Sequence, residues 1–116
     1  MIDYHKELAA ALGSILPTHY ELVLHSGLKV PCYSYQEINN YSAEQGNTIG
    51  YSRITYQVKV WADDIATVQH YTLAADRVLR PLGFKRVASN ELYDRNSTRI
   101  QKILTYEALG LENFND

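Results

Sequence analysis

The residues of this sequence that are most able to do chemistry are one cysteine, four histidines and a pair of adjacent aspartates. The cysteine, Cys32, lies between Pro31 and Tyr33 without the signature of an activated nucleophile, and the chain contains no Gly-x-Ser-x-Gly elbow. The histidines follow neither an HxH nor an HExxH spacing; they are His5, His19, His25 and His70. We therefore predict no catalytic residue, and we predict that His19 and His25 form no zinc site with Cys32.

Two other patterns have ligand-binding potential but simpler structural explanations. Asp63 and Asp64 are adjacent and carry the oxygens that a hard cation prefers, yet at the start of a helix such residues are far more often caps. The six glycines are scattered at turn positions, so none of them builds a phosphate-binding loop. The sequence predicts no metal and no cofactor.

Length and composition indicate a globular protein. The chain has 116 residues, of which 46% are hydrophobic and 21% charged, so we expect one domain over residues 1–116 with a core of its own. A lone cysteine excludes an internal disulfide. The start of the chain lacks the pattern of a signal peptide, and no apolar run reaches the roughly 18 residues of a membrane span. We expect a soluble protein made in the cytoplasm.

Charge is distributed unevenly along the chain. Residues 1–76 carry four basic and eight acidic side chains, whereas residues 77–102 carry seven basic and two acidic ones. Because the net charge is −2, this asymmetry favours contacts between subunits over contacts with nucleic acid. A nucleic-acid-binding module built on Arg77 to Lys102 remains the alternative from a different class.

The first half of the chain predicts a helix and two strands. Leu8, Leu12 and Leu16 share one helical face in a segment from Asp3 to Leu16, which Pro17 ends. Strands are predicted over residues 20–24 and 32–38. The polar, glycine-containing stretch from 39 to 50 has no period, so we predict an exposed loop or hairpin tip there.

The second half predicts a strand, a long helix and a hairpin. Residues 52–62 alternate, with a core face that consists of Ile54, Tyr56, Val58, Val60 and Ala62. The helix begins after Asp63 and Asp64, and its buried face is predicted at Ile65, Val68, Thr72, Ala75, Leu79 and Leu82. Gly83 suits the helix end. Strands over 84–92 and 98–107 enclose a turn at 93–97, and the tail after Gly110 is expected to fray.

The order of these elements predicts an α+β fold. Short connections between strands favour antiparallel pairing, so we expect a twisted, mostly antiparallel sheet of about four or five strands with both helices packed on one face. The ten tyrosines suit either strands or interfaces. Tyr41 and Tyr51, inside and just after the polar stretch, are the better interface candidates.

Part of the sequence resembles a known family. Tyr51 to Asp63 reads YSRITYQVKVWAD, and a helix and then Leu82-Gly83-Phe84-Lys85-Arg86 follow it. This resembles the small tail terminator, or tail completion, proteins of long-tailed bacteriophages and prophages, in which an Arg and an aromatic precede Tyr-Gln-x-x-x-Trp-Ala, a helix, a Gly-Phe step and a final strand pair. Pro31-Cys32-Tyr33-Ser34-Tyr35 is similar to the family's Pro-Tyr strand. The order of elements matches over residues 1–108.

The resemblance implies a structural virion protein without catalytic residues or cofactor. It implies a homo-oligomeric ring, usually a hexamer, that caps the finished tail tube and presents its other face to the head-tail connector or stopper protein. Its partners would be further copies of itself, the tail tube protein and that connector, with nucleic acid present only as the genome that passes through the ring lumen, and with no membrane. Its place would be the tail or neck of the virion, after synthesis in the bacterial host cytoplasm.

A closed ring needs two unlike patches on each subunit, because one patch must meet a different one on the next copy. We assign these contacts, with neighbours or tail proteins, to the polar stretch and the final hairpin, as a hypothesis. The interface candidates are Tyr41, Glu44, Gln45, Asn47, Tyr51, Arg53, Arg95, Arg99 and Lys102. Another connector, neck or minor tail protein is the nearest rival, and an enzyme that acts through Cys32 or His25 is a more distant one.

Overall fold

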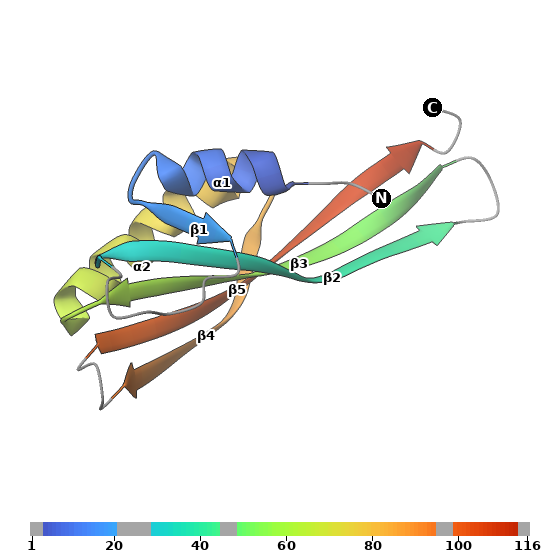
Figure 1. Cartoon of the computed structure of the whole chain (residues 1–116). Coiled ribbons are helices and arrows are strands. Elements are labelled where there is room, and N and C mark those ends of the chain that lie inside the picture. The colour runs from blue at the N-terminus through green and yellow to red at the C-terminus, as the bar shows by residue number, and fades with distance from the viewer. Residues whose placement is uncertain (1–3, 21–28, 45–48, 95–98, 114–116) are drawn as a thin grey trace.

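The chain forms a five-stranded sheet with two helices on one side of it (Figure 1). In the computed structural model the described residues are 4–20, 29–44, 49–94 and 99–113. The elements are, in order, α1 (His5–Gly13), β1 (Thr18–Tyr20), β2 (Cys32–Glu44), β3 (Ile49–Ala62), α2 (Ile65–Leu79), the 3₁₀ turn η1 (Arg80–Leu82), β4 (Lys85–Asp94) and β5 (Arg99–Asn113). The predicted α+β class is confirmed.

The sheet is antiparallel apart from one edge. Its strand order is β1-β2-β3-β5-β4, and β2, β3, β5 and β4 pair antiparallel in turn. β1 pairs parallel with β2, from Thr18 beside Tyr33 to Tyr20 beside Tyr35. Eleven residues separate Tyr20 from Cys32, which gives the chain room to return to the same end of the sheet. Residues 21–24 of the predicted first strand lie outside the described residues.

The core lies between the helices and the sheet. All five residues of the predicted β3 core face are buried, with no exposed surface. Leu8 and Leu12 of α1 and Ala75 and Leu79 of α2 pack in the same cluster. At Ile65 the prediction is wrong: this side chain is 57% exposed, because it lies at the first residue of α2, where the helix has only begun to cover the sheet.

A left-handed glycine ends the second helix. Gly83 has a φ of 94°, a conformation that costs little without a Cβ. The Phe84 N–H donates to the Leu79 carbonyl at 3.2 Å, and the Gly83 N–H donates to the Arg80 carbonyl at 2.9 Å. This closure satisfies carbonyls at the helix end and turns Phe84 into the core, where it is 2% exposed.

Aromatic rings connect α1 to the sheet. The ring of His5 stands edge-on to Tyr20 and Tyr56, with centroids 5.1 and 5.2 Å away. Tyr56 in turn meets Phe84 at 5.7 Å, and Phe84 meets Tyr4 at 5.1 Å. Edge-to-face pairs of this kind stabilise a core beyond the area that they bury. Four tyrosines of the sheet thus serve packing and are buried: Tyr33, Tyr35, Tyr56 and Tyr106. Tyr20 and Tyr93, in contrast, are at least half exposed.

Three strands continue past the helices as a narrow extension, which we call the arm (Figure 1). It comprises residues 39–44 of β2, 49–53 of β3 and 109–113 of β5, and it begins at a register shift between Glu37 and Asn39. The molecule is therefore elongated, with extents of 52 × 24 × 22 Å. We call the helix-covered remainder the body.

The arm corrects two sequence predictions. Residues 39–50 were expected to be an exposed loop or hairpin tip, but 39–44 and 49–50 are paired strands of a β2–β3 hairpin. The tail after Gly110 was expected to fray but pairs with β3 as far as Asn113. For the tail, the cause is pairing with a segment more than fifty residues away, which supplies backbone partners that local sequence does not reveal. Residues 39–44 pair with the nearby β3 across a hairpin, although their sequence does not alternate. Residues 45–48 and 95–98, at the hairpin connections, lie outside the described residues.

Candidate functional site

The cysteine lies in a structural position. Cys32 has no exposed surface and packs with Trp61 and Val30. Burial raises the pKa of its thiol to about 11, against a smaller opposite effect of the Arg99 guanidinium. The thiolate needed for nucleophilic attack is therefore scarce at neutral pH. Among the residues that the structure describes, no group of three or more His, Cys, Asp or Glu could hold a metal ion, and His25 lies outside them.

The two adjacent aspartates have separate structural roles. Asp64 is the N-cap of α2: its carboxylate accepts hydrogen bonds from the Thr67 N–H at 2.8 Å and from the Thr67 hydroxyl at 2.9 Å. These bonds, the backbone one first, lower the pKa of Asp64. Asp63 faces Arg99, with an N–O distance of 3.9 Å. The predicted cap is confirmed at Asp64.

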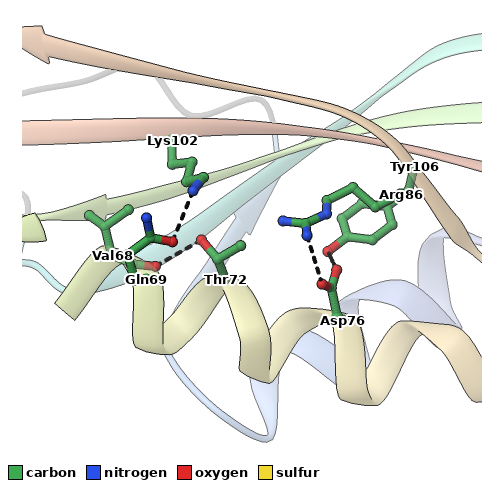
Figure 2. Close-up of polar contacts among 7 residues, drawn as sticks. All are labelled: Val68, Gln69, Thr72, Asp76, Arg86, Lys102 and Tyr106. Atoms are coloured by element: carbon green, nitrogen blue, oxygen red, sulfur yellow. Dashed lines mark hydrogen bonds and ion pairs between the residues drawn. The ribbon is translucent and has the colours of Figure 1, made fainter. Parts of the chain in front are cut away.

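A buried polar cluster fixes α2 to the sheet (Figure 2). The Tyr106 hydroxyl of β5 donates to the Asp76 carboxylate at 2.6 Å, and Arg86 of β4 lies 3.3 Å from the other carboxylate oxygen. Burial, and then the bond to Asp76, raise the pKa of Tyr106, so its hydroxyl stays protonated as a donor. Tyr33 of β2 likewise donates to the Tyr71 carbonyl of α2. These bonds set the position of the helix on the strands.

Two predicted interface residues are committed to contacts inside the chain. The ammonium of Lys102 lies 3.0 Å from the side-chain oxygen of Gln69 on α2 (Figure 2). It also lies 3.7 Å from Glu91 on β4, and the Lys102 side chain is only 12% exposed. Arg99 pairs with Asp63, as described above. These basic groups are therefore less available to a partner than their sequence suggested.

The remaining predicted interface residues lie elsewhere or outside the described part. Tyr41, Glu44, Tyr51 and Arg53 occupy the arm, where Tyr41 is paired with Arg53 and Glu44 with Gly50. Lys102 pairs with Val60 near the opposite end of β3, and Arg99 directly precedes Ile100, which pairs with Ala62. Gln45, Asn47 and Arg95 lie outside the described residues. The six described candidates thus occupy two ends of the sheet rather than one site.

The structure reveals an apolar hollow that sequence reasoning missed. It has a volume of about 300 Å³ and is lined by Ile65, Glu91, Leu92, Tyr93 and Ile100. Three of these side chains are more than half exposed, at 57% for Ile65, 52% for Leu92 and 60% for Tyr93. Large apolar side chains that gather on the surface often mark a contact with a partner. A clue was present in the sequence, since the apolar pair Leu92 and Tyr93 stands where the predicted strand 84–92 meets the turn predicted at 93–97.

Two stretches of the sheet have an open edge. β1 covers β2 only at Tyr33–Tyr35, so in the described part of the chain no strand lies beside the outer edge of residues 36–44. At the other end of the strand order, β4 pairs only with β5 among the described strands. Edges of this kind can accept a further strand through their backbone N–H and C=O groups.

Comparison with known proteins relates the chain by fold. Neither protein-family models nor curated protein sequences give a match. Among solved structures, the chain is similar to a chain of one described as the virion of a native gene transfer agent (GTA) particle. The similarity has a TM-score of 0.62 and 15% sequence identity and covers 90% of this chain and 84% of that one.

Neither helix in the described residues is long and apolar enough to cross a membrane.

Proposed function

We propose that this protein is a structural component of a phage-like virion, a tail terminator that assembles as a ring on the end of the tail tube. The observation that carries the proposal is the fold shared, over nine tenths of the chain, with a chain from a GTA virion particle. The sequence resemblance to tail terminators points the same way. The ring, with a hexamer as the expected copy number, joins the tube to the head connector.

Features of the surface support an assembly role rather than a catalytic one. The cysteine is buried with a raised pKa, and two of the basic interface candidates are paired with carboxylates inside the chain. What the surface offers instead is open strand edges and an apolar hollow. These are means of binding other protein chains. We therefore propose a non-enzymatic protein that needs no cofactor.

The test is whether the protein caps tail tubes. Tubes polymerised from tail tube protein are mixed with this protein and imaged by negative-stain electron microscopy, while tube elongation is followed by turbidity. A terminator binds at one end of each tube and stops elongation at substoichiometric amounts. Tubes that keep growing, with protein bound along their sides or not at all, would contradict the proposal.

A connector, neck or minor tail protein is the nearest alternative, and the same experiment separates it, because such a protein leaves tube elongation unchanged. A nucleic-acid-binding module is the alternative from another class. Arg77, Arg80 and Lys85 are exposed basic residues, but Arg86, Arg99 and Lys102 have carboxylate partners. Steeply salt-dependent binding to DNA or RNA would favour that alternative.

A further inference from the structure

Only the last part of β4, residues 88–94, lacks the Pro, Lys and bulges that usually protect an edge, since Lys85 and a register shift lie before it. Natural edge strands carry Pro, Lys or bulges that prevent pairing with another chain. The register shift in β4 lies between Arg86 and Ala88, and the following residues, ASNELYD, include no Pro, Lys or Gly. Leu92 and Tyr93, exposed, lie on this unprotected stretch beside the apolar hollow. A strand of this kind is suited to bind a second strand.

We propose that β4 of one copy pairs with residues 36–44 of β2 in the next copy, so that the sheet continues from subunit to subunit. This inference rests on the proposed ring and names its contact. Within the chain, three antiparallel pairings separate β2 from β4, so the two strands run in opposite directions. A sheet that continues in the same sense therefore joins them antiparallel and leaves the helices of every copy on one side.

The free parts of the two edges lie at different positions along the strand direction, and the difference fits a closed ring. Asp94, at the end of β4, is paired with Arg99, whereas Gln36 aligns through Gln57 with Thr105, six residues further along β5. β1 occupies the outer edge of β2 up to Tyr35, so β4 of one copy can pair only with β2 residues from Gln36 onward in the next copy. This pairing displaces the next copy along the strand direction by the six-residue offset, about 20 Å at roughly 3.3 Å per residue.

Closure of a sheet requires a shift of similar size. Strands in closed sheets tilt by about 35–45°, and neighbouring strands are about 4.8 Å apart. Each copy contributes four long strands, which are β2, β3, β5 and β4. A closed sheet then requires each copy to be displaced along the strand direction by about 13–19 Å relative to the previous copy. Since the step imposed by β1 is close to this value, the contact generates a tilted, closing sheet rather than a flat, open one.

The register also brings exposed apolar side chains of the two copies together. With Gln36 beside Asp94, Ile38 falls beside Leu92, and these residues are 50% and 52% exposed in the single chain. Pairing covers both and brings Ile38 to the rim of the hollow that Leu92 lines. The second copy is thus complementary in backbone and in apolar surface.

The test is disulfide trapping between copies. Ile38→Cys and Leu92→Cys are prepared as two separate proteins in a Cys32→Ser background, and circular dichroism checks that each remains folded. Cysteines at directly opposed strand positions lie within reach of a disulfide. Under mild oxidation, the mixture should give at least about tenfold more covalent dimer than either protein alone, because the contact joins unlike patches. Leu73→Cys, on the exposed surface of α2, replaces Leu92→Cys as the matched control.

The outcomes separate this inference from the proposed function, because the mass of the unoxidised assembly is measured in parallel by light scattering. A ring by mass with no Ile38–Leu92 disulfide overturns the inference and leaves the proposed function standing. Trapped mixed dimers without a ring support the contact and contradict the ring. Equal trapping with the Leu73→Cys control, or dimers from a single variant, overturns the inference in either case.

Discussion

The body and the arm differ in what holds them together. In the body, two helices cover the sheet and enclose buried aromatic and aliphatic side chains, such as Phe84 and Tyr56. In the arm, three strands pair with one another beyond the helices (Figure 1). Burial of apolar surface is the main source of folding free energy, so stability should depend on the body. The arm is then free to serve assembly, and substitutions should separate the two properties.

The largest loss of stability is expected from the centre of the body. Phe84→Ala removes a 2% exposed ring that meets Tyr4 and Tyr56 edge-on, so it should lower the free energy of unfolding by about 3–5 kcal/mol. Urea unfolding followed by circular dichroism measures this. Leu73→Ala, at a 53% exposed position of α2, is the control and should cost little. Similar losses for both would contradict the assignment of the core.

The polar cluster between α2 and the sheet should rank second. Asp76→Ala leaves the Tyr106 hydroxyl and Arg86 without their buried partner, which should cost about 2–3 kcal/mol. Tyr106→Phe removes only the hydroxyl and should cost less. In a double-mutant cycle the two losses should not add, because both substitutions remove the same hydrogen bond. Additive losses would show that Asp76 and Tyr106 do not act on each other.

The N-cap of α2 should give a smaller, pH-dependent effect. The folded-state pKa of Asp64 lies below its ordinary value, so its charged form stabilises the fold above about pH 4, and this contribution is lost as the pH falls through the folded-state pKa. The difference in stability between the wild type and Asp64→Ala should therefore shrink from pH 6 to pH 2. Asp64→Asn keeps an oxygen acceptor and should lose less at pH 6. A difference independent of pH would contradict the role of the carboxylate.

The smallest change in stability is expected from the arm. Replacement of residues 43–51 by Asn-Gly, a two-residue hairpin turn, should change the free energy of unfolding by about 1 kcal/mol or less. The same replacement should abolish assembly and tube capping, because it removes part of the strand edge that meets β4 of the next copy. Intact assembly of the shortened protein would overturn the role of the arm.

The sequence predicts the body well because its signals there are local. The alternation of residues 54–62, the cap at Asp64 and the glycine at position 83 each follow from neighbouring residues, and all three are confirmed. Ile65 is the exception, since helical periodicity cannot tell where a helix first meets its sheet.

The arm and the apolar hollow depend on residues that are distant in the sequence. Ile49 pairs with Asn113. Ile65 and Tyr93 line one hollow only because α2 packs against β5 and β4. No periodic pattern reveals either contact. For the same reason Lys102 was predicted at an interface: its approach to Gln69 is visible only in the fold.

The most direct test of the assembly role is the mass of the purified protein in solution, measured by light scattering alone and after addition of tail tube protein. The account predicts a species of the size of a closed ring, six copies of the 13.3 kDa chain, in at least one of the two samples. A monomer in both samples, at concentrations where the protein remains folded, would contradict it.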